Sequence, residues 1–114
     1  MVGKAIANGG EIFNDYTNNT AAGEDSHAEG WSTTASGMAS HAEGHGTEAS
    51  GSASHSEGGK TKATNTAAHA EGYESEATAQ AAHAEGYGAK ATGDFSHAEG
   101  ELTIASGYDS HAEG

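Results

Sequence analysis

The sequence contains no proline and no cysteine, and the missing cysteine excludes a disulfide framework. Basic residues are scarce as well, since 4 Lys and Arg stand against 17 Asp and Glu, for a formal net charge of -13. This acidity argues against nucleic-acid binding, which uses basic patches, and against a membrane-surface role. No apolar run reaches the length of about 18 residues that spans a bilayer, and MVGKAIANGG lacks the charged and apolar regions of a signal peptide. We therefore expect no membrane insertion.

Large hydrophobic residues are also few. Hydrophobic residues make up 33% of the chain, and most of them are alanine. Burial stabilises by about 25 cal/mol per Å² of apolar surface, so each alanine contributes little, whereas ordering a residue costs about 1–2 kcal/mol. A lone compact monomer would be marginal. Either the chain is disordered, or backbone ladders and partner chains stabilise it.

A strict repeat of 14 residues argues against disorder. The unit reads S-H-A-E-G-x-x-T-x-A-S-G-x-x, and we number its positions 1 to 14 from Ser26. Position 2 is His27, His41, His55, His69, His83, His97 and His111. Position 4 is Glu29, Glu43, Glu57, Glu71, Glu85, Glu99 and Glu113. A flexible Gly/Ala/Ser linker needs no fixed residues at a fixed spacing, so these two columns argue against a linker.

The segment before the first full copy resembles a degenerate coil. Counting back one period from Ser26 gives residues 12–25, with Phe13 and Asp15 where later copies carry His and Glu. Terminal repeats often depart from the consensus because they cap the stack. We expect residues 1–25 to form an N-terminal cap and residues 26–114 a seven-copy array. The sequence stops after the seventh HAEG, which suggests a truncated last copy and a longer parent protein.

Alternation within the unit predicts strands, because side chains alternate between the two faces of a strand. His and Glu then share one face of S-H-A-E-G, and Ala points to the other. Positions 8 and 10 should point inward, since position 9 between them varies freely. Glycine at positions 5 and 12 should supply the unusual backbone angles of two corners. The prediction is an all-β parallel β-roll with two short strands per coil, an interior of Ala, Ser and Thr, and coils about 4.8 Å apart.

The unit resembles the head repeats of trimeric autotransporter adhesins and bacterial haemagglutinins, S-V-A-I-G followed by A-x-A-x-G at the same spacing. SHAEG with T-x-A-S-G is more similar to repeats of phage tail and tail-fibre proteins, in which a GGEIFNDY-like segment, here residues 9–16, precedes the first repeat. The resemblance implies a left-handed β-roll that assembles as a homotrimer, in a fibre on a virion tail or a cell surface. It also implies a possible host glycan or protein partner, contacted through other domains.

The His and Glu columns carry the most informative chemistry. Stacked carboxylates 4.8 Å apart repel by about 0.9 kcal/mol even in bulk water, so the His column is the obvious relief. We favour structural His–Glu ladders that face a trimer axis and fix its register, in which case all fourteen residues are interface residues. Two alternatives stay open: solvated columns, and an axial metal in some layers, with His41, His55, His69 and His83 as candidate ligands. The favoured interpretation requires no cofactor.

Catalysis is not expected, because H-x-E without a companion cysteine motif does not make a deaminase, and neither H-E-x-x-H nor G-x-S-x-G occurs. The leading interpretation is a rigid trimeric fibre spacer, structural or adhesive. The alternative is a ligand-binding module that binds metal at the His layers or carbohydrate at corner aromatics. The candidate surface residues for such binding are Trp31, Tyr73, Tyr87 and Tyr108. Ice binding is disfavoured, because the single Thr column should point inward.

Overall fold

The computed structural model describes residues 6–7, 11–13 and 18–114, with side chains from residue 18 onward. All described secondary structure is β-strand, arranged in two parallel sheets of eight strands. The short-strand sheet contains β1 (Ile6–Ala7), β3 (Thr20–Ala21), β5 (Thr34–Ala35), β7 (Glu48–Ala49), β9 (Lys62–Ala63), β11 (Glu76–Ala77), β13 (Lys90–Ala91) and β15 (Ile104–Ala105). The long-strand sheet contains β2 (Glu11–Phe13), β4 (His27–Trp31), β6 (His41–His45), β8 (His55–Gly59), β10 (His69–Tyr73), β12 (His83–Tyr87), β14 (His97–Glu101) and β16 (His111–Glu113).

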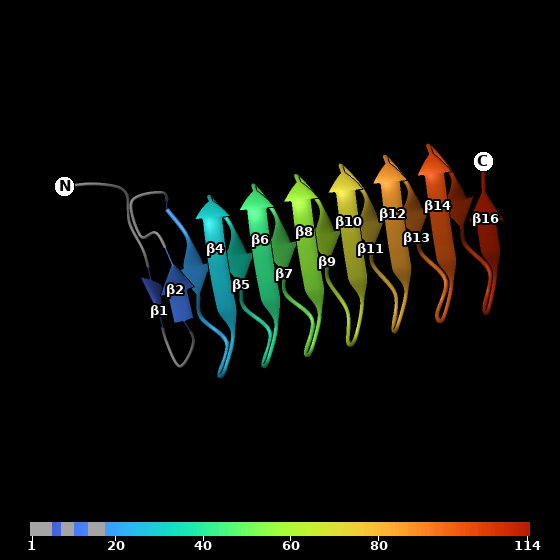
Figure 1. The fold of residues 1–114 in the computed structure, drawn as a ribbon. Coiled ribbons are helices and arrows are strands. Elements are labelled where there is room, and N and C mark those ends of the chain that lie inside the picture. The colour runs from blue at the N-terminus through green and yellow to red at the C-terminus, as the bar shows by residue number, and fades with distance from the viewer. Residues whose placement is uncertain (1–5, 8–10, 14–17) are drawn as a thin grey trace.

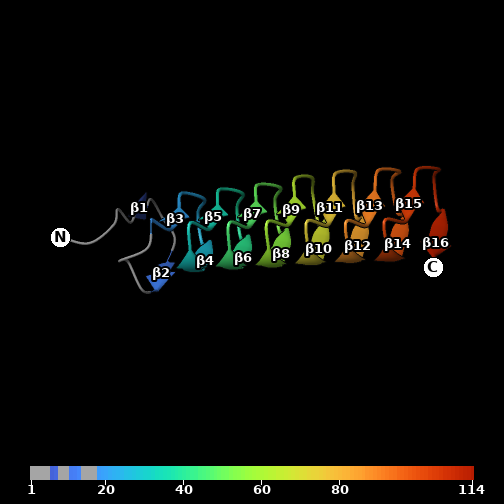
Figure 2. The same cartoon turned by 90° about the horizontal axis from the view of Figure 1, so that it is seen from above.

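Successive coils stack in parallel with a register of 14 residues. His69 pairs with His83 in the long-strand sheet, and Ala77 pairs with Ala91 in the short-strand sheet. The coils follow one another along the long axis of the molecule, and the two sheets form two rows (Figures 1 and 2). The principal extents are 44 × 23 × 11 Å, so the molecule is a thin slab. This architecture confirms the predicted all-β parallel β-roll with two strands per coil.

The interior between the sheets is made of small side chains, as predicted. Apart from Ala112 in the last strand, the alanines at positions 3 and 10 of the seven copies are almost fully buried: Ala28, Ala35, Ala42, Ala49, Ala63, Ala70, Ala77, Ala84, Ala91, Ala98 and Ala105. Position 8 adds buried Thr33, Thr47 and Thr61. The Thr47 hydroxyl donates to the Glu43 carbonyl at 3.1 Å, so its burial leaves no unpaired hydroxyl. Position 9 points outward, as its variation indicates.

The first corner has the expected glycine geometry. Position 5 glycines have φ between 104° and 120°, a region that only glycine occupies readily. A Cβ on Gly44 would also overlap the backbone of Gly58 in the next coil. Two residues later, position 7 has a left-handed backbone as well, with φ of 57° at Ser32 and 67° at Gly46.

The prediction for the second corner is wrong in its mechanism. Glycines at position 12, such as Gly37, do not have a left-handed backbone. The left-handed residue lies at position 14, for example Ala39 with φ 58° and Phe95 with φ 59°. Gly37 permits close approach instead, because a Cβ there would overlap the carbonyl of Gly51, although Asn65 and Ala79 occupy position 12 in two other coils.

The N-terminal coil differs in register from the prediction. β1 keeps the offset of 14, since Ile6 pairs with Thr20, but β2 is offset by 16, so that Glu11 pairs with His27 and Phe13 with Glu29. Phe13 therefore occupies the Glu position and not the His position. Asp15 and about half of the proposed cap lie outside the described residues, so the cap stays a prediction.

Candidate functional site

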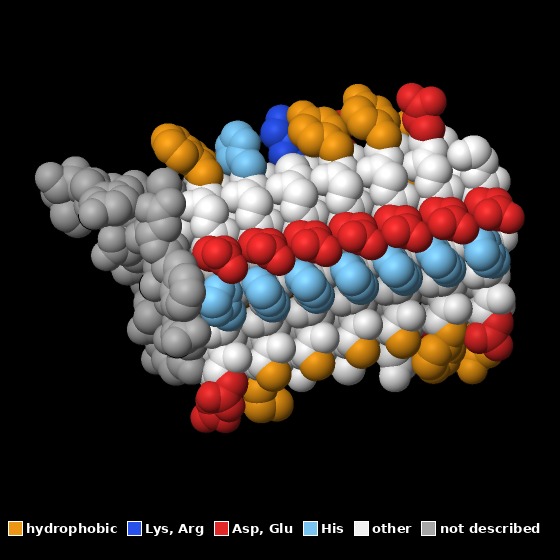
Figure 3. Space-filling view, viewed as in Figure 1, with side chains coloured by type: hydrophobic (Ala, Val, Ile, Leu, Met, Phe, Trp, Pro, Cys, Tyr) orange, Lys and Arg blue, Asp and Glu red, His pale blue; other side chains and the backbone are white. Residues whose placement is uncertain are grey.

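The long-strand sheet presents two parallel columns of ionisable side chains on its outer face. We call them the His–Glu ladder: His27, His41, His55, His69, His83, His97 and His111, with Glu29, Glu43, Glu57, Glu71, Glu85, Glu99 and Glu113. The columns run side by side along the molecule (Figure 3). The ladder arises because positions 2 and 4 share one face of each strand while Ala at position 3 enters the core.

The imidazole rings stack on one another along the ladder. Ring centroids of His41 and His55 are 4.7 Å apart and their planes differ by 8°, and those of His83 and His97 are 4.5 Å apart and differ by 1°. The spacing is that of neighbouring strands, so the fold itself imposes the stacking. Each ring thereby covers the faces of its neighbours and shields them from water.

The carboxylates connect one coil to the next. His97 Nε2 lies 3.2 Å from Glu85 Oε1, and His83 Nε2 lies 3.4 Å from Glu71 Oε1, in each case the Glu of the preceding coil. The Glu85 carboxylate thus has a hydrogen-bond donor beside it instead of only other carboxylates. His97 lowers the pKa of Glu85 through this hydrogen bond.

In the middle of the ladder the contacts are longer and shared. Glu43 Oε1 lies 3.6 Å from the Nε2 atoms of both His41 and His55. The Nε2 atoms of His41, His55 and His69 are shielded from solvent and have no hydrogen-bond partner among the described residues. Burial, and next the neighbouring imidazoles, lower the pKa of His41 and His69 below the ordinary value of 6.5. These two rings are therefore neutral at neutral pH.

Apolar side chains flank the ladder at both ends of the long strands. Trp31, Tyr73 and Tyr87 stand at position 6, and each is exposed. The Tyr73 and Tyr87 rings stack at 5.6 Å between centroids. Met38 and Tyr108 are exposed beside the opposite end of the strands, at the second corner. Figure 3 shows this order on one face: an edge on which apolar side chains alternate with His and charged ones, the Glu column, the His column, and a second edge with apolar side chains.

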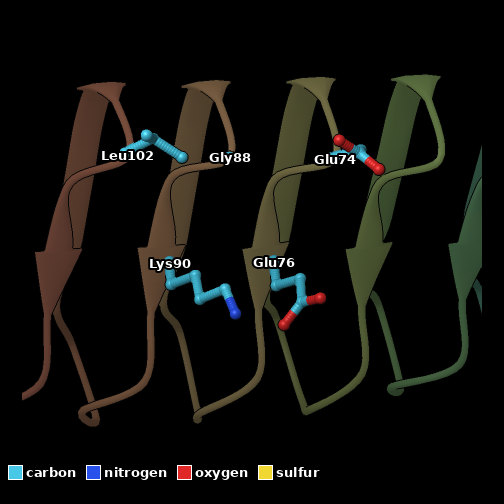
Figure 4. Close-up of a pocket in the computed structure, with 5 residues that line it drawn as sticks. All are labelled: Glu74, Glu76, Gly88, Lys90 and Leu102. Carbon is cyan, nitrogen blue, oxygen red and sulfur yellow. The ribbon is translucent and has the colours of Figure 1, made fainter.

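The opposite face carries a pattern that the sequence reasoning missed. Position 9 of four successive coils alternates in charge, because Glu48, Lys62, Glu76 and Lys90 are direct partners in neighbouring strands. Beside Glu76 and Lys90 lies a shallow hollow of about 250 Å³, lined also by Glu74, Gly88 and Leu102 (Figure 4). Carboxylates, an ammonium group and a leucine do not form a consistent ligand set. The alternation could have been recognised in the sequence, because Glu and Lys follow each other there at intervals of 14 residues.

The structure brings the predicted ladder residues together, and leaves the predicted surface aromatics Trp31, Tyr73, Tyr87 and Tyr108 exposed. Whether the ladder meets partner chains stays a prediction, as does the expectation that the chain is not an enzyme. Comparison with protein-family models, curated proteins and solved structures finds no match. Within the described residues, no helix is long and apolar enough to cross a membrane. The ladder and its apolar edges are therefore the basis for inferring function.

Proposed function

We propose that this chain is a rigid segment of a trimeric fibre, in which three copies stand side by side with their His–Glu ladders toward a common axis. The fibre would belong to a phage tail or to a bacterial surface adhesin. Contact with a host glycan or protein would come from other domains of the parent protein. The SHAEG and T-x-A-S-G motifs of the repeat support the fibre assignment.

The observation that carries the proposal is the position of the large apolar side chains. From residue 18 onward, every one of them is exposed: Trp31, Met38, Tyr73, Tyr87, Phe95, Leu102, Ile104 and Tyr108. The core contains alanine where other folds use leucine or phenylalanine. Burying such a side chain stabilises by about 1.5–3 kcal/mol. These side chains would therefore gain stability by packing against a partner chain.

The ladder face has the shape and chemistry that side-by-side association requires. It is one face of a thin slab, its His and Glu columns lie side by side, and exposed apolar residues stand on both sides of it. Three such faces would bring three His and three Glu together in each layer, and buried polar groups persist where every one is hydrogen-bonded. The unequal residues at position 6, Trp31, His45 and Gly59 in the first three coils, would select one register among those that the ladder allows.

Sedimentation equilibrium tests the proposal. We expect a mass of three chains of 11.3 kDa each, with β-rich circular dichroism. The double variant Tyr73→Ser/Tyr87→Ser should dissociate at higher protein concentration, because it removes the apolar edge beside the ladder. Ile104→Ser is the matched control, since Ile104 is also exposed but lies on the short-strand sheet. A monomer with a β-rich spectrum would refute the trimer.

A further inference from the structure

Among the described residues, five sets of three ligand atoms converge on the ladder, each with its atoms within 4.8 Å of one another. One of them, Glu99–His111–Glu113, has a single His. The other four consist of two His from adjacent coils and the Glu between them: His27–Glu29–His41, His41–Glu43–His55, His69–Glu71–His83 and His83–Glu85–His97. Glu43 shows the arrangement most simply, because one oxygen lies 3.6 Å from the Nε2 atoms on either side.

The nitrogen atoms in the middle of the ladder lie beside carboxylates without a hydrogen bond to them. A transition metal binds the lone pair of an imidazole nitrogen. The Nε2 atoms of His41, His55 and His69 are shielded from solvent without a hydrogen-bond partner in the described part of the chain. They face a carboxylate, so a cation between them would satisfy both groups.

We propose that the His–Glu ladder binds divalent transition metals of the Zn²⁺, Ni²⁺ and Cu²⁺ class, each ion held by two His of adjacent coils and one Glu. Imidazole nitrogen with carboxylate oxygen is a ligand set that suits these ions. Bonds of about 2.0–2.2 Å place tetrahedral ligand atoms roughly 3.4 Å apart. The 3.2 Å between His97 and Glu85 already fits, and the half-exposed rings can rotate to close the wider gaps. The fourth position is open to water.

The repeat limits the number of ions. Each Nε2 binds one ion, so the two sets that share His41 exclude each other, as do the two that share His83. The four sets therefore hold two ions per chain and not four. All ligands of an ion come from one chain, so the site does not depend on the trimer, and the net charge of -13 draws cations to it.

Isothermal titration of the full chain with Zn²⁺ at neutral pH tests the proposal. Saturation should occur at two ions per chain, with a rise of several degrees in the thermal unfolding midpoint. The variant His41→Gln/His83→Gln removes both shared ligands, so we expect at least a tenfold loss of affinity and no rise in the midpoint. His45→Gln is the matched control, because His45 lies on the same strand as His41 but outside the ladder. Absence of binding, or binding unchanged in the double variant, overturns the proposal.

A second measurement covers failure of the double variant to fold. Diethyl pyrocarbonate modifies accessible imidazoles, and mass spectrometry locates the modified residues in the wild-type chain. Zn²⁺ should slow modification of His41 and His83 several-fold and leave the rate at His45 unchanged. Equal rates with and without Zn²⁺ at His41 and His83 contradict the proposed site.

Discussion

Single glycines show how closely the coils approach one another. Gly44 and Gly46 lie two residues apart in the same corner, and both have positive φ, 111° and 67°. A Cβ on Gly44 would overlap the backbone of the next coil, whereas a Cβ on Gly46 would lie 3.7 Å from the Lys60 side chain, an ordinary contact. Other coils carry Ser or Glu at the position of Gly46, so only Gly44 is sterically obligatory.

We expect Gly44→Ala to destabilise the fold by more than about 1 kcal/mol, because the strained φ alone costs about 1–3 kcal/mol and the backbone clash adds to it. Gly46→Ala should cost well under half as much. Urea unfolding followed by circular dichroism measures both variants. Equal losses would mean that the coils do not approach as closely as this geometry requires.

The ladder histidines predict the direction of the pH response. The pKa of His41 is lowered by burial and by His55 and His27, while Glu43 and Glu29 act against the shift. Between this lowered pKa and 6.5 the unfolded chain binds more protons, so stability is complete above about pH 6.5 and decreases as pH falls through the folded pKa. The pKa of His69 is shifted in the same direction.

The urea midpoint should therefore be lower at about pH 5.5 than at about pH 8. The folded-state pKa of Glu85 lies below its ordinary value of 4.5, so protonation of this carboxylate should lower the stability further when the pH falls below about 4.5. His69→Gln should flatten the response between the two pH values, and His45→Gln should not. Greater stability at the lower pH would show that imidazolium–carboxylate pairs dominate the ladder instead.

The repeated positions of the sequence predicted the structure of a coil, but they did not predict why each position carries its residue. The burial of Ala28 and Thr33 and the exposure of Lys62 follow from alternation, which is local. The role of Gly37 does not, since its restriction comes from the backbone of the next coil. Ala39 gave no signal at all, because alanine at φ 58° is not a recognised turn residue. The cross-coil pairing of His97 with Glu85 was likewise undecidable from order along the chain.

At the scale of the strands, both outer faces place ionisable side chains of neighbouring coils beside one another. The long-strand sheet pairs His83 with Glu71 of the preceding coil, and the short-strand sheet alternates Glu48, Lys62, Glu76 and Lys90. Opposite charges directly across neighbouring strands are worth about 0.2–1 kcal/mol per pair. A register shift by one coil would place like charges opposite each other on the short-strand sheet, so the alternation disfavours slippage.

Lys62→Glu should destabilise the fold more than Lys62→Gln, by several tenths of a kcal/mol, because it creates three Glu in a row. Thermal unfolding at low salt measures the difference between the two variants. At about 1 M salt the difference should vanish, since screening acts within about 3 Å. A difference that persists at high salt would point to packing and not to charge.

At the scale of the whole molecule, a slab with an extent of only 11 Å has two faces and little interior. Alanine, serine and threonine make up most of that interior, and from residue 18 onward the large apolar side chains lie outside it. The fold class and the coil were predictable from the period. The number of chains was not, because association depends on the outer faces of copies that one sequence does not place.

The central claim is that three copies meet through the His–Glu ladder, and a distance between spin labels tests it most directly. The chain has no cysteine, so one introduced cysteine labels one site. Tyr73→Cys lies at the edge of the ladder, and Lys90→Cys lies on the opposite sheet. Double electron–electron resonance should give a shorter inter-chain distance at residue 73 than at residue 90. A shorter distance at residue 90, or no inter-chain distance at either residue, would contradict the account.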